Sequence, residues 1–367
     1  MVEMLPLEME IRRRITAAGP MPVAEYMALC LGDREHGYYM TRDPLGARGD
    51  FITAPEISQM FGELIGLWMA AVWKQMGAPK SIRIIELGPG RGTLMKDALR
   101  AAQVLPAFRD AVALHLVEIS PVLEAQQERT LEHLSIPMFW HPALVDVPKG
   151  PAIIIANEFF DALPVNQAVK AENCWCERQI EIDSAGNLAF TVAHDTIPHF
   201  QTLLPLAVRE APEHSIFEWR ADTIAFDLGR RIADHGGAGL VIDYGHAESA
   251  IGETLQAVGQ HAYVDPLTAP GNIDLTAHVD FQALALAVEA MGANGFGPIE
   301  QAEFLRRLGI ETRAATLKAK ATSRAAAADI ESALARLIGH GRTGMGTLFK
   351  IAAFAHPSVG VPAGFER

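Results

Sequence analysis

Between residues 82 and 156 the sequence alternates short apolar runs with helical patterns, an order that few folds accommodate. The apolar runs cover residues 82–87, 113–117, 136–140 and 152–156. The last run contains only Ala and Ile, as is typical of a strand that helices cover on both faces. Residues 93–102 and 121–134 predict the helices between the strands. We therefore predict an α/β fold with a doubly wound, parallel sheet.

The segments beside this core predict two additions to it. Residues 57–76 carry apolar side chains on one helical face, and residues 1–80 as a whole read as helices around a glycine-rich segment. Residues 165–192 alternate apolar and polar side chains around a turn at residues 184–187. That pattern predicts an inserted β-hairpin.

The last third of the chain predicts the elements that complete the sheet. The predictions are a helix at residues 223–235, a buried strand at 239–244, a long loop at 245–276 and a helix at 281–291. Two further apolar runs, at residues 296–299 and 347–353, are separated by helices. We expect this pair to close the sheet as antiparallel strands.

The charge and cysteine content restrict the class of protein. The chain has 31 basic and 44 acidic side chains and a formal net charge of −13, which argues against a nucleic-acid substrate. Three cysteines give no disulfide framework. The acidic start differs from a secretory or transit peptide, and no apolar run is long enough to span a membrane. The sequence therefore predicts a cytoplasmic protein without membrane insertion.

The strongest candidate site is the glycine-rich segment directly after the first predicted strand. Glu86 precedes three glycines at alternate positions, Gly88, Gly90 and Gly92, and a predicted helix follows. Glycines there let a ligand approach the backbone, and the start of the helix offers unpaired N–H groups. A Walker loop would need Gly-Lys-Ser/Thr, and a dinucleotide fingerprint would need a wider last spacing. The pattern favours S-adenosyl-L-methionine (SAM), with Glu86 bonding its ammonium group; a glycine turn without ligand is the alternative.

A second acidic residue supports an adenosyl ligand. Glu118 follows the second predicted strand, where a carboxylate can accept hydrogen bonds from both hydroxyl groups of a ribose. A solvent-exposed glutamate at a strand end is the alternative for this residue alone. With the glycine segment, Glu118 favours SAM binding.

The fourth predicted strand ends in a polar and aromatic segment, residues 157–161. Asn157, Glu158 and Asp161 are expected beside the transferred methyl group, because ligands of doubly wound sheets bind where the strand order reverses. A carboxylate can orient a cationic nucleophile, although Glu158 and Asp161 could equally cap the following segment. Phe159 and Phe160 predict a wall of the substrate pocket. The histidines and cysteines show no metal-ligand spacing, so we expect no metal.

A series of longer motifs resembles one family. The motifs are residues 37–39, 49–58, 86–92, 157–165, 242–245 and 274–281, in that order. Together they are similar to the MidA-like family of SAM-dependent methyltransferases, over residues 20 to 350. Its mitochondrial members are assembly factors for respiratory complex I.

The resemblance implies a seven-stranded class I methyltransferase sheet. Residues 1–80 would be a helical addition that covers the active site, and residues 81–367 the SAM-binding domain, with an insertion at about 165–222. Gly88, Gly90, Gly92 and Glu118 would hold SAM. The segment that contains Asp50 and Thr53 would fold over the pocket.

The resemblance also implies methylation of an arginine on a protein substrate, a subunit of respiratory NADH dehydrogenase. The absence of a visible presequence indicates a bacterial, cytoplasmic member. Other functions stay open: a methyltransferase for a small molecule or RNA, a SAM-binding assembly factor without catalysis, and an NAD-linked oxidoreductase. A homo-oligomer is also open.

Overall fold

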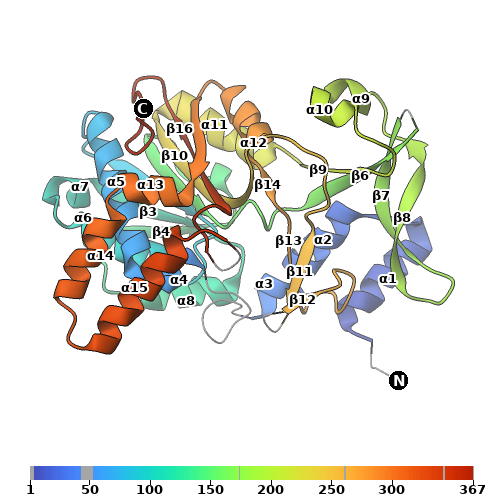
Figure 1. Ribbon diagram of the computed structural model, residues 1–367, viewed down its shortest axis with the longest axis horizontal. Helices are drawn as coiled ribbons and strands as arrows, with labels where there is room; N and C mark the ends of the chain where they lie inside the picture. The colour runs from blue at the N-terminus through green and yellow to red at the C-terminus, as the bar shows by residue number, and fades with distance from the viewer. Residues whose placement is uncertain (1–3, 43–52, 173, 260–261, 342–343, 367) are drawn as a thin grey trace.

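The structure is a computed structural model that describes residues 4–42, 53–172, 174–259, 262–341 and 344–366. It has two halves, one built on an eight-stranded sheet and the other on a five-stranded sheet (Figure 1). In spatial order the larger sheet contains β15 (Asn294–Glu300), β16 (Phe349–Ala355), β10 (Gly237–His246), β5 (Ala152–Asn157), β2 (Ile82–Leu87), β3 (Val112–Val117) and β4 (Met138–His141). The short β14 (Val279–Asp280) pairs with β10.

The topology of the larger sheet is doubly wound. Strands β10, β5, β2, β3 and β4 are parallel, and β16 runs antiparallel to both β10 and β15. The chain adds β3 and β4 on one side of β2, and later adds β5 and β10 on the other side. The predicted α/β fold, including the antiparallel pair that closes the sheet, is confirmed.

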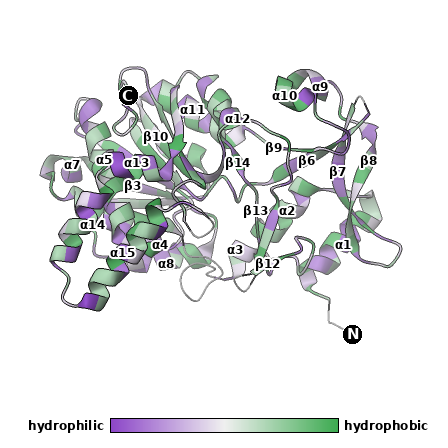
Figure 2. Cartoon of the chain, in the orientation of Figure 1, coloured by the Kyte–Doolittle hydropathy of each residue, from purple (hydrophilic) through white to green (hydrophobic). Residues whose placement is uncertain are grey.

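Burial on both faces explains why the central strands read as unbroken apolar runs. Along β5, Ile153 and Ile155 belong to one hydrophobic cluster, whereas Ile154 and Ala156 belong to the cluster on the opposite face. Successive side chains of a strand point to opposite faces, so each face needs its own apolar partners. Figure 2 shows the hydrophobic character of the strands around β10.

Helices supply those partners on both faces. The face that carries Ile153 and Ile155 is covered by a group of helices. They are α5 (Gln59–Gln75), α6 (Thr93–Ala102), α7 (Pro106–Ala111), α8 (Pro121–Leu131), α13 (Gln301–Arg307), α14 (Ile310–Ala319) and α15 (Arg324–Ile338). The second face is covered by α11 (Thr223–His235), α12 (Phe281–Glu289) and the 3₁₀ turn η1 (Leu144–Asp146). Ser58 caps α5 by accepting a hydrogen bond from the Met60 N–H.

The predicted inserted hairpin is only part of a larger antiparallel sheet. This sheet contains β1 (Met21–Pro22), β7 (Cys174–Ile182), β6 (Val165–Ala171) and β9 (Ile216–Arg220), with β8 (Leu188–Thr196) paired to β7. Two short helices, α9 (Phe200–Leu203) and α10 (Leu206–Arg209), lie above it (Figure 1). The sequence predicted too few strands for this sheet, because β1 and β9 pair with strands that are far away in the sequence and local periodicity does not reveal such pairing.

The predicted long loop at residues 245–276 is wrong in part. A three-stranded sheet forms there, with the order β12 (Ala262–Val264), β11 (Gln256–Gly259) and β13 (Asp274–Thr276). These strands are short and lie among Gly and Pro residues, so their sequence has no strand pattern. Packing of Ala257 and Leu275 into a buried cluster stabilises them.

The helices of residues 1–80 divide between the two halves. Helices α1 (Pro6–Ala18) and α2 (Val23–Gly32) pack with β6, β7 and β13, and α3 (Tyr38–Thr41) continues that part. The short α4 (Ala54–Ile57) and the long α5 belong instead to the larger half, where α5 packs against α6. The described helices of the N-terminal segment thus contribute to both halves of the molecule.

Candidate active site

A cavity of about 930 Å³ lies at the carboxyl ends of β2, β3 and β5, with walls from both halves of the molecule. Its volume is near the upper end of the range for ligand pockets, roughly 300–1,000 Å³. The strand order reverses between β2 and β5, which is where doubly wound sheets bind ligands. Of the residues predicted from sequence, it is lined by Thr53, Glu86, Gly88, Gly90, Glu118, Asn157, Glu158, Phe159 and Asp161.

The glycine loop follows β2 and has no room for a side chain at Gly88. Gly88 has φ +60°, a conformation that glycine adopts without strain. A Cβ atom there would lie 2.8 Å from Cδ2 of Phe159. Gly92, also at positive φ, stands at the N-cap of α6 and is not among the lining residues.

Glu86 places a buried carboxyl group at the base of the loop. The residue is 2% exposed, and its Oε2 has no hydrogen-bond partner among the described residues. Burial first, and then the charge of Glu118, raise the pKa of Glu86 well above its usual value. A ligand that brings a cation or an N–H donor to this oxygen would satisfy it.

Glu118 is held in place at the end of β3. Its Oε1 accepts hydrogen bonds from the N–H groups of Ile119 at 2.9 Å and Ser120 at 2.8 Å. Its Oε2 accepts a hydrogen bond of 3.0 Å from Gln127 of α8. The carboxylate therefore has a fixed orientation at the cavity wall.

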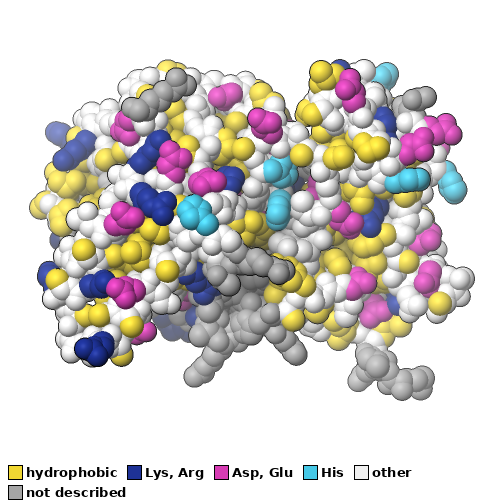
Figure 3. Space-filling view, in the orientation of Figure 1, with side chains coloured by type: hydrophobic (Ala, Val, Ile, Leu, Met, Phe, Trp, Pro, Cys, Tyr) yellow, Lys and Arg dark blue, Asp and Glu magenta, His cyan; other side chains and the backbone are white. Residues whose placement is uncertain are grey.

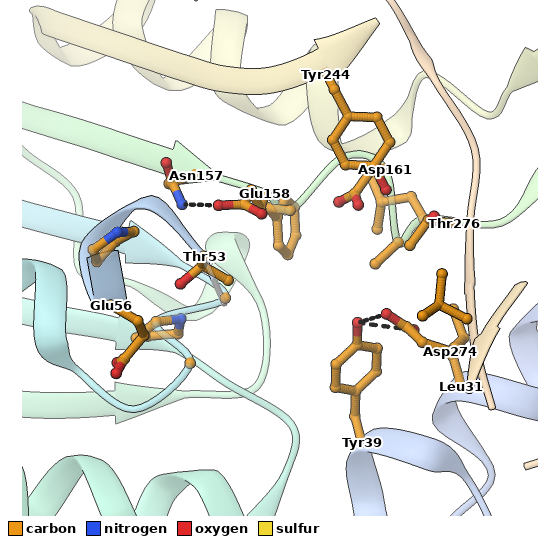
Figure 4. Close-up of a pocket in the computed structure, with 18 of the residues that line it drawn as sticks. Leu31, Tyr39, Thr53, Glu56, Asn157, Glu158, Asp161, Tyr244, Asp274 and Thr276 are labelled. Carbon is orange, nitrogen blue, oxygen red and sulfur yellow. Dashed lines mark hydrogen bonds between the residues drawn. The ribbon is translucent and has the colours of Figure 1, made fainter. Parts of the chain in front are cut away.

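Glu158 follows β5 in a strained conformation. Its φ is +49°, which is unusual for a residue with a side chain. Oε1 of Glu158 accepts a hydrogen bond from the Ala54 N–H at 3.2 Å. It accepts a second one from Nδ2 of Asn157 at 3.3 Å (Figure 4). Burial, and next the charge of Asp161, raise the pKa of Glu158 to about 7. A carboxyl group that titrates near neutral pH can take up a proton during a reaction.

Asp243 fixes the turn that carries Glu158. Its Oδ2 accepts hydrogen bonds from three successive backbone N–H groups, those of Phe159 at 3.2 Å, Phe160 at 3.0 Å and Asp161 at 3.2 Å. Its Oδ1 accepts a further one from the Tyr244 N–H at 2.9 Å. The fully buried Asp243 thus orients the site without lining the cavity.

Asp161 faces the cavity from the same turn. It is 5% exposed, and its Oδ1 has no hydrogen-bond partner among the described residues. Burial raises the pKa of Asp161, although the Tyr244 hydroxyl and the Arg220 guanidinium oppose that effect. Asp161 thus brings to the cavity wall a buried acceptor that the described residues leave without a donor.

The far end of the cavity consists of residues that belong to the family motifs but that the sequence did not bring together in one site. The Tyr39 hydroxyl donates to both carboxyl oxygens of Asp274, at 3.1 and 3.2 Å (Figure 4). Tyr244 and Thr276 lie on the same side, near Asp161. Tyr39 comes from α3, Tyr244 from β10, and Asp274 and Thr276 from β13, so three separate motifs meet here only in the fold.

Two predicted pocket residues are not placed in the cavity wall. Phe160 is 4% exposed and packs in the hydrophobic cluster between the central sheet, α11 and α12. Only Phe159 of the pair lines the cavity. Asp50 lies outside the described residues. No group of three His, Cys, Asp or Glu side chains within the described ranges is arranged to hold a metal ion.

Comparisons with known sequences agree with this geometry. A family model of S-adenosyl-L-methionine-dependent methyltransferases matches residues 64–299. A Drosophila melanogaster protein named "Protein arginine methyltransferase NDUFAF7 homolog, mitochondrial" is 39% identical over 345 residues, or 86% of this chain and 77% of that protein. The human protein named "Protein arginine methyltransferase NDUFAF7, mitochondrial" is 38% identical over 332 residues, or 84% of this chain and 74% of that protein.

Solved structures show the same fold. A Burkholderia thailandensis protein, described as a likely methyl transferase and crystallised with S-adenosyl-homocysteine, superposes with a TM-score of 0.86 at 28% identity. The match covers 98% of this chain and 94% of the other. A native structure of a protein from the same organism gives a TM-score of 0.83 at 29% identity.

The predicted cytoplasmic location is contradicted by the comparisons, because the relatives are named mitochondrial. The prediction relied on the absence of a presequence pattern at the start of the chain, which is weak evidence. None of the helices in the described part of the chain is long and apolar enough to cross a membrane.

Proposed function

Because the chain belongs to the MidA-like family of SAM-dependent methyltransferases, we propose that it methylates an arginine side chain of a protein substrate. The observation that carries the proposal is the position of two carboxyl groups, Glu158 and Asp161, in the cavity that begins at the glycine loop. Relatives named arginine methyltransferases, at 38–39% identity over most of the chain, support the choice of arginine.

The residues at the sheet edge fit the cofactor. The unpartnered Oε2 of Glu86 suits the ammonium group of SAM, and the absence of a Cβ at Gly88 lets the ring of Phe159 pack against the loop at the cavity wall. We assign the ribose hydroxyl groups to Glu118, and further cofactor contacts to Gly90 and Asn157, while Gly92 shapes the start of α6. When bound, SAM supplies an activated methyl group.

Glu158 suits the role of proton acceptor. A guanidinium must lose a proton to attack, and a base with a pKa near neutral pH is matched to that step. The Ala54 N–H and Asn157 hold Oε1 of Glu158 in place, which fixes its direction relative to the substrate. Asp161 would hold the cation next to it, with Thr53 and Phe159 forming nearby walls.

The charge of the molecule supports a protein substrate over RNA. The net charge of −13 disfavours a phosphate backbone and favours a basic segment. On the face shown in Figure 3, acidic side chains are spread over both halves of the molecule and lie between the basic side chains of the larger half. Following the family resemblance, we expect the substrate to be a subunit of respiratory NADH dehydrogenase.

The proposal is tested by fractionating the product. Purified protein and SAM labelled in the methyl group are incubated with an extract of cells that lack this protein. Label in a single protein band, dependent on active enzyme, is the expected result. Label in RNA or in small molecules would contradict the proposal, and so would SAM binding without any transfer.

A further inference from the structure

We propose that Asp161 selects the substrate side chain, binding a guanidinium in preference to an ammonium, in a position that Arg220 of the inserted sheet sets. The inference rests on the proposed function, since it concerns the same nucleophile. It gives the two carboxyl groups of the turn different roles: Glu158 accepts a proton, and Asp161 recognises the cation.

The first observation is the unsatisfied oxygen of Asp161. The residue is only 5% exposed, lines the cavity and has an Oδ1 without a hydrogen-bond partner in the described part of the chain. A buried acceptor without a donor is costly, so a native structure that keeps one at a cavity is expected to receive the donor from its ligand.

The second observation is that Asp161 and Glu158 face the same cavity from one turn. Their charges affect each other, because the charge of Asp161 contributes to the raised pKa of Glu158. A guanidinium has five N–H donors in a fixed plane and can bond two carboxylates at once. An ammonium group is a compact charge that is more strongly hydrated, so it loses more solvation and matches two separate acceptors less well.

The third observation is the position of Arg220, at the end of β9. Its Nη1 donates to the carbonyl oxygen of His278 at 2.7 Å, and its Nη2 donates to those of Ala277 at 2.6 Å and Asp161 at 3.3 Å. Its Nε donates to the carbonyl of Leu163 at 3.2 Å. One side chain thus connects the turn that carries Asp161 to the segment after β13.

These bonds make Arg220 a positioning residue. It contacts the backbone of Asp161, and its planar, forked donor group reaches four carbonyl oxygens at once. A lysine keeps the charge but has three donors on a single nitrogen atom, so it reaches fewer of these four carbonyl oxygens and holds the two segments less firmly. The five-stranded sheet, which lies outside the cofactor end of the cavity, thereby acts on the choice of substrate.

The test measures ligand binding and does not depend on turnover. The full-length protein is saturated with S-adenosyl-homocysteine, and the affinities of N-acetyl-arginine amide and N-acetyl-lysine amide are measured by calorimetry. We expect wild type to prefer the arginine ligand. Asp161→Asn should lower the affinity for the arginine ligand about tenfold or more, as expected for the loss of a charge-assisted hydrogen bond, and should thereby lower the ratio of arginine to lysine affinity. Arg220→Lys should lower the ratio of arginine to lysine affinity, with S-adenosyl-homocysteine binding unchanged.

Two matched variants separate this role from general stability. Arg178→Lys changes an arginine of the same sheet that pairs with Glu253, and Asp183→Asn changes an aspartate of an exposed turn. Both should keep the wild-type ratio of arginine to lysine affinity. If Asp161→Asn and Arg220→Lys also keep that ratio, the inference is wrong while the proposed function stands. If wild type does not prefer the arginine ligand, arginine specificity itself is wrong.

Discussion

Gln127 joins Glu118 to the glycine loop: its Nε2 donates to Oε2 of Glu118 at 3.0 Å and to the carbonyl oxygen of Gly90 at 2.8 Å. The Gln127 side chain is fully buried, and its Oε1 accepts a hydrogen bond of 2.9 Å from Nε1 of Trp140. One side-chain amide of α8 therefore fixes Glu118, to which we assign the ribose hydroxyl groups, relative to the glycine loop, to which we assign other contacts with the cofactor.

Gln127→Met should weaken SAM binding by about tenfold, because each lost hydrogen bond is worth roughly 1 kcal/mol and Glu118 becomes free to turn. Calorimetric titration with SAM checks this. Gln126→Met is the control, since the Gln126 side chain bonds within α8, to Thr130 and Arg129. Equal affinities for the two variants would show that Gln127 does not position the cofactor residues.

Gly88→Ala should destabilise the protein by about 2–3 kcal/mol and abolish tight SAM binding. The new Cβ would lie 2.8 Å from the ring of Phe159, and the positive φ adds strain. Gly186→Ala is a matched control, because Gly186 has φ +83° and no neighbouring atom within 4 Å of the position that a Cβ would take. It should cost only the backbone strain, about 1 kcal/mol. Denaturant unfolding measures both, and similar losses would contradict the steric argument.

The reaction rate should fall as the pH drops through about 7, since Glu158 accepts a proton only as a carboxylate and burial raises its pKa to about that value. Glu158→Gln should remove this acid limb and lower kcat about 100-fold or more, the usual contribution of a general base. SAM affinity should be unchanged. A mutant that keeps both the rate and the acid limb would exclude Glu158 as the base.

Glu63→Gln should destabilise the protein at neutral pH by about 1–3 kcal/mol, because Glu63 of α5 accepts hydrogen bonds from Arg100 of α6 and Arg313 of α14. Burial raises the pKa of Glu63, but the two arginines outweigh it and hold the pKa below its ordinary value.

A carboxyl group with a lowered pKa stabilises the fold above its ordinary pKa and loses that effect as the pH falls. The difference in unfolding free energy between wild type and Glu63→Gln should therefore shrink below about pH 4.5. Unfolding in denaturant at several pH values measures it. Glu132→Gln, at the exposed end of α8, is the control and should change the unfolding free energy at neutral pH by less than about 0.5 kcal/mol.

The sequence was informative where local pattern and tertiary environment agree. The predicted strand at 152–156 matches β5 within one residue, because a strand buried on both faces must be apolar throughout. The glycine segment was found for a similar reason, since the positive φ of Gly88 and the close ring of Phe159 exclude other residues.

The sequence was less informative where partners are distant. Tyr39 and Asp274 are hydrogen-bonded across 235 positions, and β1 pairs with residues of β7 that also lie far beyond local reach. Asp243 belongs to the motif at residues 242–245, but the motif does not show that this residue holds the turn of Glu158, because its four backbone donors are visible only in the fold. Phe160 was expected in the pocket wall, and the turn directs it into the core instead.

The central claim, that this cavity transfers a methyl group to arginine, is tested most directly on the labelled protein itself. The band labelled by wild type is hydrolysed to amino acids, and the labelled residue is identified by mass spectrometry, with Glu158→Gln as the parallel reaction. We predict methylarginine with wild type and almost none with Glu158→Gln. A labelled residue other than methylarginine, or equal labelling by Glu158→Gln, would contradict the claim.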